Sequence, residues 1–150
     1  MNSVSVVLML IAGAGTAAQI AINAHLRAVS GSALWAANIT FAVSMLAGLV
    51  ATAAVFPFAP VGFPNPALWR APSWVWLGGL GGAVYVLLAI VLAARLGALL
   101  LAAAGIVGQL GASLLIDHYG WFGMPVQPAT PTRLIGVALL AAGVVLIRWK

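Results

Sequence analysis

The sequence contains no cysteine, one acidic residue and two histidines. The absence of cysteine excludes disulfides, thiolate metal sites and cysteine nucleophiles. Asp117 is the only carboxylate side chain, so the chain cannot form the carboxylate pair of many acid–base enzymes. Serine, histidine and aspartate also do not occur at a spacing that suggests a catalytic triad. We therefore expect no enzymatic activity, no cofactor and no metal site.

Charged residues of either sign are scarce. They make up 5% of the chain, and apolar residues make up 65%, whereas soluble domains carry about 25% charged residues. With a mean hydropathy of +1.19, a soluble protein of this composition would aggregate, so the composition predicts a membrane protein. The net charge of +5 does not indicate nucleic-acid binding, because the cations stand singly at the edges of apolar blocks. These cations are Arg27, Arg70, Arg95, Arg133, Arg148 and Lys150.

Charges and prolines divide the chain into five apolar blocks, which predict an all-α polytopic membrane protein with one transmembrane domain over residues 1–150. The third and fourth blocks are separated only by Arg95 and Leu96, so we expect a tight helical hairpin. The uncharged part of the fifth block, the 14 residues between Arg133 and Arg148, is only about 21 Å long against a hydrocarbon core of about 30 Å, so both arginines should snorkel outward. The expected helices cover residues 4–26, 33–56, 74–94, 97–116 and 132–149.

Two segments between these blocks are rich in proline and aromatic residues. Five prolines between residues 57 and 72 exclude helix there, and residues 117–132 form a second polar segment. Both should lie at the membrane surface, the first with aromatic anchors at Phe56, Phe58, Phe63 and Trp69. An odd number of spans separates the termini, and the bias of cationic residues predicts a cytoplasmic C-terminus. The bias is small, so insertion in both orientations remains open.

Uncharged hydrogen-bonding residues occur sparsely within the expected helices. Gln19 and Asn23 lie one turn apart, and Gly105, Gln109 and Ser113 form a stripe on the fourth helix. Polar groups in hydrocarbon are costly unless paired, so these faces should point into the bundle. There they either hydrogen-bond between helices or contact a substrate. The candidate substrate-binding residues are Gln19, Asn23, Asn38, Tyr85 and Gln109.

Asp117 ends the fourth expected helix beside His118. One interpretation gives it a structural role in topology, capping or an ion pair with an arginine such as Arg133. The other makes Asp117 a proton site in a transport cycle. His25 and His118 would lie on opposite sides of the membrane, so one chain could not bring them together around a metal ion.

Several stretches resemble the YdcZ-like five-helix family of the drug/metabolite transporter superfamily. They are GTAAQ at 15–19, WLGGLGG at 76–82, GQLGASLLIDHYGWFG at 108–123 and RLIG at 133–136. The usual member of that superfamily has ten helices in two inverted halves. The resemblance therefore implies that this chain is one half, which pairs with a second copy or with a five-helix paralogue.

The last apolar block, GVALLAAGV at 136–144, is similar to the dimerising helix of small multidrug resistance transporters. This likeness implies a dimer interface at Gly136 and Gly143, two glycines on one helix face. Those transporters depend on a glutamate in their first helix, where this chain has Gln19 and Asn23. Proton-coupled drug antiport of that kind is therefore not expected.

Together these features predict an inner-membrane transporter for a small neutral or zwitterionic metabolite, because amides both donate and accept hydrogen bonds. It would work by alternating access as a dimer, with an antiparallel pair favoured because it supplies inverted repeats. The expected partners are the lipid bilayer, a second copy or paralogue, and a small molecule, but no nucleic acid. The alternative is a non-transporting packing or regulatory subunit, whose polar residues would bond only to one another.

Overall fold

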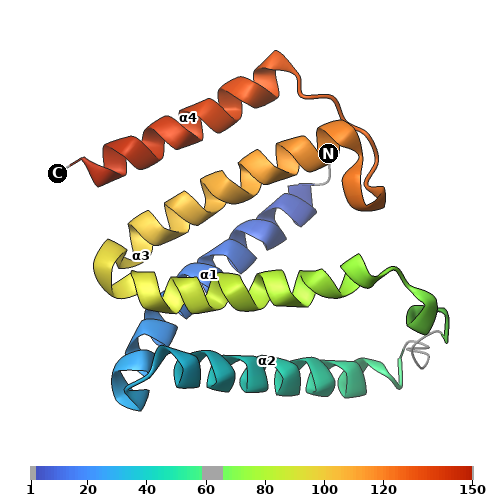
Figure 1. Ribbon diagram of the computed structural model, residues 1–150, viewed down its shortest axis with the longest axis vertical. Coiled ribbons are helices and arrows are strands. Elements are labelled where there is room, and N and C mark those ends of the chain that lie inside the picture. The colour runs from blue at the N-terminus through green and yellow to red at the C-terminus, as the bar shows by residue number, and fades with distance from the viewer. Residues whose placement is uncertain (1–2, 59–65, 150) are drawn as a thin grey trace. The chain divides into compact units, whose positions relative to one another are not determined.

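The computed structural model describes residues 3–58 and 66–149, and all regular structure within these ranges is helical (Figure 1). Four of the described stretches are long and apolar enough to cross a membrane. This confirms the all-α, polytopic membrane class. The α-helices are α1 (Ser3–Ser30), α2 (Ala33–Val55), α3 (Leu77–Tyr119) and α4 (Pro131–Arg148), and the short 3-10 helices are η1 (Pro66–Arg70), η2 (Ser73–Trp76) and η3 (Trp121–Gly123).

Local sequence signals determine where the helices begin and end. Helix α1 ends before Gly31, whose φ of 71° lies in the left-handed region that glycine adopts readily. Helix α2 begins after Ser32, whose hydroxyl accepts a hydrogen bond from the Trp35 amide at 3.5 Å. Helix α4 begins with Pro131, where the missing N–H costs nothing, and its N-cap is the side chain of Thr130.

Helix α3 is interrupted at Gly97, where φ is 76° and ψ is 162°. This combination is open almost exclusively to glycine, so helical geometry stops there and resumes at the next residue. The interruption divides α3 into two segments, 77–96 and 98–119. The expected turn at Arg95 and Leu96 therefore lies instead at Gly97, because only glycine can adopt the required backbone.

The proline-rich segment before α3 differs in part from the expectation. Residues 66–70 form η1, which begins with Pro66 and ends with Arg70, so the expectation of no helix across 57–72 is wrong for these residues. Proline is tolerated at the first position of a helical turn, where its N–H has no partner to lose. Phe58 and Trp69 are exposed, as aromatic anchors would be. Pro60, Phe63 and Pro64 lie outside the described residues.

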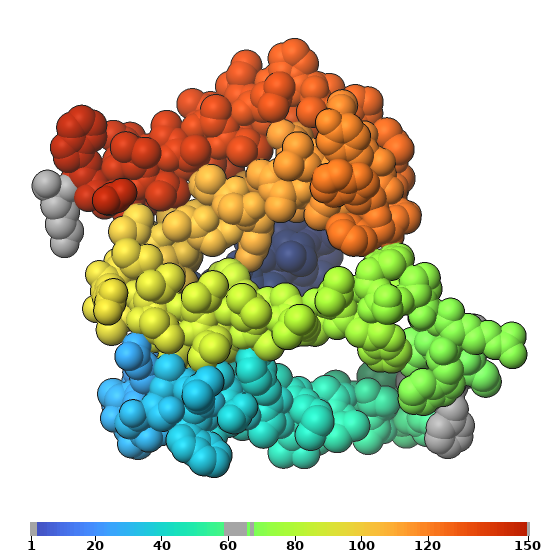
Figure 2. Space-filling model, viewed as in Figure 1, coloured from blue at the N-terminus to red at the C-terminus, as the bar shows by residue number. Residues whose placement is uncertain are grey.

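The chain divides into two compact units. In the unit Gln19–Ala94, α2 lies beside the first segment of α3 (Figure 1). The core of this unit is Ala36 and Ala37 of α2 against Ile90 of α3, and small alanines let the two helices approach closely. Figure 2 shows that the helices touch near the start of α2 and separate toward its end, where α2 has only exposed residues.

The other unit comprises Met1–Ala18 and Arg95–Lys150. In it, α4 runs beside the second segment of α3 (Figure 1). None of the described residues of α4 is buried, so this helix is packed loosely within the single chain. Apolar side chains such as Leu139 and Leu146 are exposed along it. Such a surface suits contact with lipid or with another membrane helix.

Candidate functional site

Asn23 is one of the few buried polar residues in the described part of the chain, with 7% of its surface exposed. The hydroxyl of Thr40 in α2 donates to Oδ1 of Asn23 in α1 at 2.9 Å. The same hydroxyl lies 2.9 Å from the carbonyl of Ala36, and its single proton must be shared between the two acceptors. Asn23 therefore uses its amide oxygen to join two helices, which is the interhelical role considered as one alternative from the sequence.

Arg27, one turn after Asn23, also joins helices. Its Nη1 donates to the carbonyl oxygens of Ile90 at 3.2 Å and Val91 at 3.1 Å. These carbonyls lie near the end of the 77–96 segment, where a cation interacts favourably with the helix dipole. The sequence indicated only a membrane-flanking role for Arg27, because contacts between helices distant in sequence leave no local signal.

The other candidate substrate-binding residues are more open. Gln19, Asn38 and Gln109 are exposed, and Tyr85 is half-buried. Within residues 3–58 and 66–149, none of their side chains makes a hydrogen bond. Asn38 precedes Thr40 by two residues, about 200° around the helix, and so it does not join the Asn23 pair.

A second polar cluster lies where α3 ends and α4 begins. Nη1 of Arg133 is 3.7 Å from Oδ2 of Asp117, and the two side chains are 40% and 29% exposed. This is the ion pair considered for Asp117 from the sequence. Arg133 also donates to the backbone carbonyl of Gln127 at 3.4 Å and to its side-chain oxygen. The backbone N–H of Gln127 in turn donates to the backbone carbonyl of Asp117 at 2.8 Å. The connecting loop therefore contacts both charged residues.

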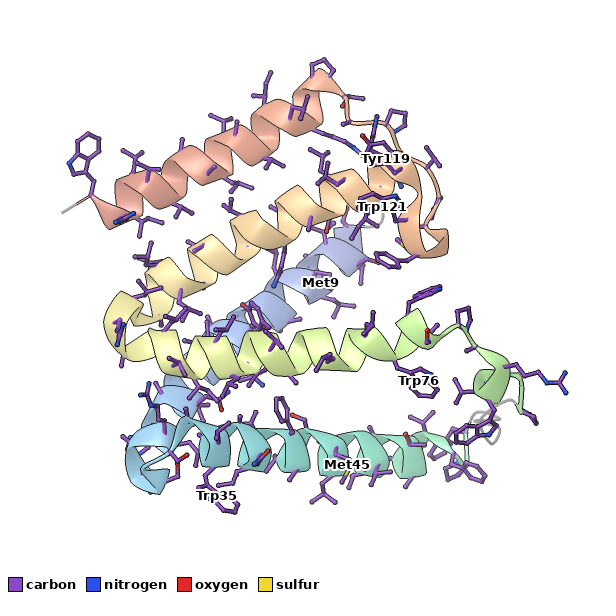
Figure 3. All side chains as sticks on the ribbon, viewed as in Figure 1. Met9, Trp35, Met45, Trp76, Tyr119 and Trp121 are labelled. Atoms are coloured by element: carbon purple, nitrogen blue, oxygen red, sulfur yellow. The ribbon has the colours of Figure 1, made fainter. Side chains whose placement is uncertain are left out.

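The loop itself is held by backbone and ring contacts. Nδ1 of His118 accepts a hydrogen bond from the Ala129 amide at 3.1 Å. The rings of Tyr119 and Trp121 stack with centroids 5.4 Å apart (Figure 3). Gly120 has φ of 65°, and a Cβ there would lie 2.7 Å from a methyl carbon of Val126. Only glycine fits this close approach, so the turn that positions Asp117 depends on it.

A pocket of about 300 Å³ opens between the second segment of α3 and α4, with the ion pair in its wall. Ser113 is the other polar side chain that lines it, and the remaining lining is apolar. The lining residues are Leu110, Ser113, Leu114, Asp117, Arg133, Gly136, Val137 and Leu140.

A second pocket, of about 200 Å³, lies farther along the same two helices and is lined entirely by apolar residues. Gly143 lines this second pocket, whereas Gly136 lines the first. A Cβ at either glycine would meet no atom within 4 Å. The two glycines assigned to one interface from the sequence therefore border two different spaces on the side of α4 that faces α3.

Comparison with protein families shows which family the chain belongs to. A family model described as "Putative inner membrane exporter, YdcZ" matches residues 4–146. The chain belongs to this family. No curated protein and no solved structure matches it. The resemblance to YdcZ-like proteins is thereby confirmed, whereas the likeness of the last helix to small multidrug resistance transporters stays a prediction.

Membership of the YdcZ family and the apolar helices together make the chain a multi-pass inner-membrane protein of a transporter family, not of an enzyme family. The sequence did not identify Thr40 or Gln127 as partners of the polar residues. A signal for Thr40 exists, since it is the only hydroxyl residue in the first half of α2. Gln127 lies between two prolines and carries no comparable signal.

Proposed function

We propose that this YdcZ-family protein transports a small neutral or zwitterionic metabolite across the inner membrane, as a dimer working by alternating access. The observation that carries the proposal is the set of exposed amides Gln19, Asn38 and Gln109, which have no hydrogen-bond partner among the described residues. An amide moved from water into hydrocarbon without a partner costs about 4–8 kcal/mol. Each amide therefore needs a partner from outside the chain.

Two of these amides lie deep in the membrane. Gln19 and Gln109 are each at least ten residues from both ends of their helical segments, or about 15 Å along the axis. Water or substrate in a transport pathway would satisfy both hydrogen-bonding groups of each amide. A second copy of the chain would satisfy these amides only where its own polar groups met them. In a dimer, some amides would bond to the second copy and others to water or substrate.

The side chains available in the membrane interior favour an uncharged or zwitterionic substrate. The one carboxylate, Asp117, lies in the last turn of α3 and not within the membrane interior. A cation in transit would therefore meet only amide oxygens and the Tyr85 ring, which stabilise it weakly. Amides accept and donate equally well, and they suit a ligand that carries both kinds of group.

Assembly follows from the number of crossings. The stretch Ser73–Tyr119 has 47 residues, or about 70 Å of helix, more than twice a hydrocarbon core of about 30 Å. With its interruption at Gly97, it supplies two crossings, and the chain makes five. Five crossings are half of an inverted-repeat transporter, and an antiparallel second copy supplies the other half. The cytoplasmic C-terminus and insertion in both orientations remain part of this proposal.

The chain has no cysteine, so single-cysteine variants report on one site without further engineering. Gln19→Cys and Ala21→Cys form a matched pair, because both positions are exposed and lie about 200° apart at nearly the same depth. We expect a membrane-impermeant thiol reagent to modify Gln19→Cys in intact vesicles much faster than Ala21→Cys, which the proposal places toward lipid. If both cysteines stay unmodified from either side of the membrane, no aqueous pathway passes Gln19, and a packing subunit is the better description.

A further inference from the structure

We propose that the pocket between the end of α3 and the start of α4 binds a small zwitterion with an apolar body. Asp117 receives the ammonium group and Arg133 receives the anionic group. This inference rests on the proposed function and names its substrate class. It adds a recognition site that is separate from the amides deeper in the membrane.

The ion pair has unused capacity for a ligand. At 3.7 Å, the closest approach of Arg133 to Asp117 is too long for a direct hydrogen bond. The Asp117 carboxylate accepts no hydrogen bond from side chains or backbone in the described ranges. Arg133 directs two nitrogens at Gln127 and has five N–H donors. Both charges can therefore bind opposite charges of a ligand without losing their existing partners.

The charged pair stands at one end of a space that is otherwise apolar. Leu110, Leu114, Val137 and Leu140 line the remainder. A volume of about 300 Å³ is at the lower end of the range for small-molecule sites. This size and polarity suit a molecule whose ammonium and anionic groups are close together on a compact apolar body, as in an apolar amino acid.

The position of the pocket suits capture from water. Asp117 lies in the last turn of α3, and Arg133 lies in the first turn of α4. Both side chains are partly exposed, so a charged ligand reaches them without entering hydrocarbon. Gln109 lies eight residues before Asp117 on the same helix, about 12 Å deeper. The order of these groups is that of an entry site followed by a pathway.

The two glycines of α4 border two different spaces, and only the space beside Gly136 is the proposed ligand site. The space beside Gly136 is the pocket with the charged pair, and the space beside Gly143 is the apolar pocket. A leucine at position 136 projects into the ligand space, whereas a leucine at position 143 does not. Gly136→Leu should therefore block the ligand, and Gly143→Leu should leave ligand binding intact.

The test is calorimetric binding of L-phenylalanine to the purified full-length protein in detergent. We expect N-acetyl-phenylalanine, which lacks the ammonium, and phenylalanine amide, which lacks the carboxylate, to bind at least about tenfold more weakly. Gly136→Leu and Asp117→Asn should lose binding by a similar factor, and Asp117→Asn keeps the test valid if Gly136→Leu does not fold. Gly143→Leu and Ala138→Leu, which changes the opposite face of α4, should bind as the parent does.

Equal binding of phenylalanine and its two blocked derivatives would overturn the assignment of the charges. So would binding that survives both Gly136→Leu and Asp117→Asn. A third contrary result is competition in nanodiscs, where phosphatidylethanolamine but not phosphatidylglycerol displaces phenylalanine completely, because the occupant would then be a lipid. Failure of phenylalanine to bind, with Gln19→Cys still modified from water, would refute this inference alone. Binding with an unreactive Gln19→Cys would instead refute the transport pathway.

Discussion

The hydrogen bond between Thr40 and Asn23 allows a quantitative test of how α1 and α2 are held together. Thr40→Val removes the hydroxyl and preserves the shape of the side chain. It leaves Oδ1 of Asn23, a residue only 7% exposed, without its 2.9 Å donor. An unsatisfied buried polar group costs about 1–3 kcal/mol, whereas measured couplings of polar pairs in membrane helices average about 0.6 kcal/mol and reach about 1.7 kcal/mol. We expect Thr40→Val to lower the free energy of unfolding by about 1–2 kcal/mol.

A matched control lies in the same helix. Thr52 donates to the carbonyl of Gly48 at 2.9 Å, just as Thr40 contacts the carbonyl of Ala36, one turn before it. Thr52 is exposed, however, and within the described residues its hydroxyl bonds only to its own helix. Thr52→Val should therefore change stability by less than about 0.5 kcal/mol. The assay is reversible unfolding in mixed micelles with increasing SDS, applied to a double-mutant cycle with Asn23→Leu. A coupling energy near zero, or equal effects of the two threonine substitutions, would refute the reasoning.

Three further substitutions test other contacts by the same assay. Arg27→Met removes charge-assisted bonds to Ile90 and Val91 and should cost about 1.5–3 kcal/mol, a loss that Arg27→Lys should partly restore; equal loss in both variants would contradict the role of the charge. Gly97→Ala places a side chain at φ of 76° and should cost about 1–3 kcal/mol, whereas Gly79→Ala, in regular helix with open space at its Cβ, should be neutral or stabilising. Asp117→Asn should lower stability by less than about 1 kcal/mol, because the ion pair is partly exposed, and a larger loss would show that the pair holds the loop.

The fold class could be predicted from the sequence because lipid imposes a simple rule. Backbone groups in hydrocarbon must bond within their own segment, so long apolar blocks become helices whatever their detailed packing. In the structure α1 ends before Gly31 and α4 begins at Pro131, two local signals that the expected bounds of 4–26 and 132–149 did not use. The turn within α3 was expected at Arg95 and Leu96, directly before Gly97, because the charge of Arg95 suggested a boundary there, whereas the backbone conformation at Gly97 sets the actual position.

The polar contacts were less predictable, for a physical reason. Spacing along one helix shows which residues share a face, but it does not show which helix that face meets. Asn23 was therefore identified as a candidate, but its partner Thr40 was not. Gly136 and Gly143 share one face of α4 by their spacing, but the spaces beside them depend on how far α4 stands from α3, and their place in a dimer interface stays a prediction. The candidate pairing of Asp117 with Arg133 could be suggested because only one carboxylate was available to the arginines.

Substrate movement through purified protein tests the central claim, transport past amides at membrane depth, most directly. The measurement is counterflow in proteoliposomes, each preloaded with one member of a panel of neutral and zwitterionic metabolites. It compares the parent with Gln109→Leu and with the control Ala112→Leu, where Ala112 is an exposed residue on the same helix. We predict labelled uptake of at least one zwitterion by the parent and by Ala112→Leu, and a loss of about tenfold or more in Gln109→Leu, the equivalent of one hydrogen bond. Uptake by the parent no greater than that of empty liposomes, or equal uptake by all three proteins, would contradict the account.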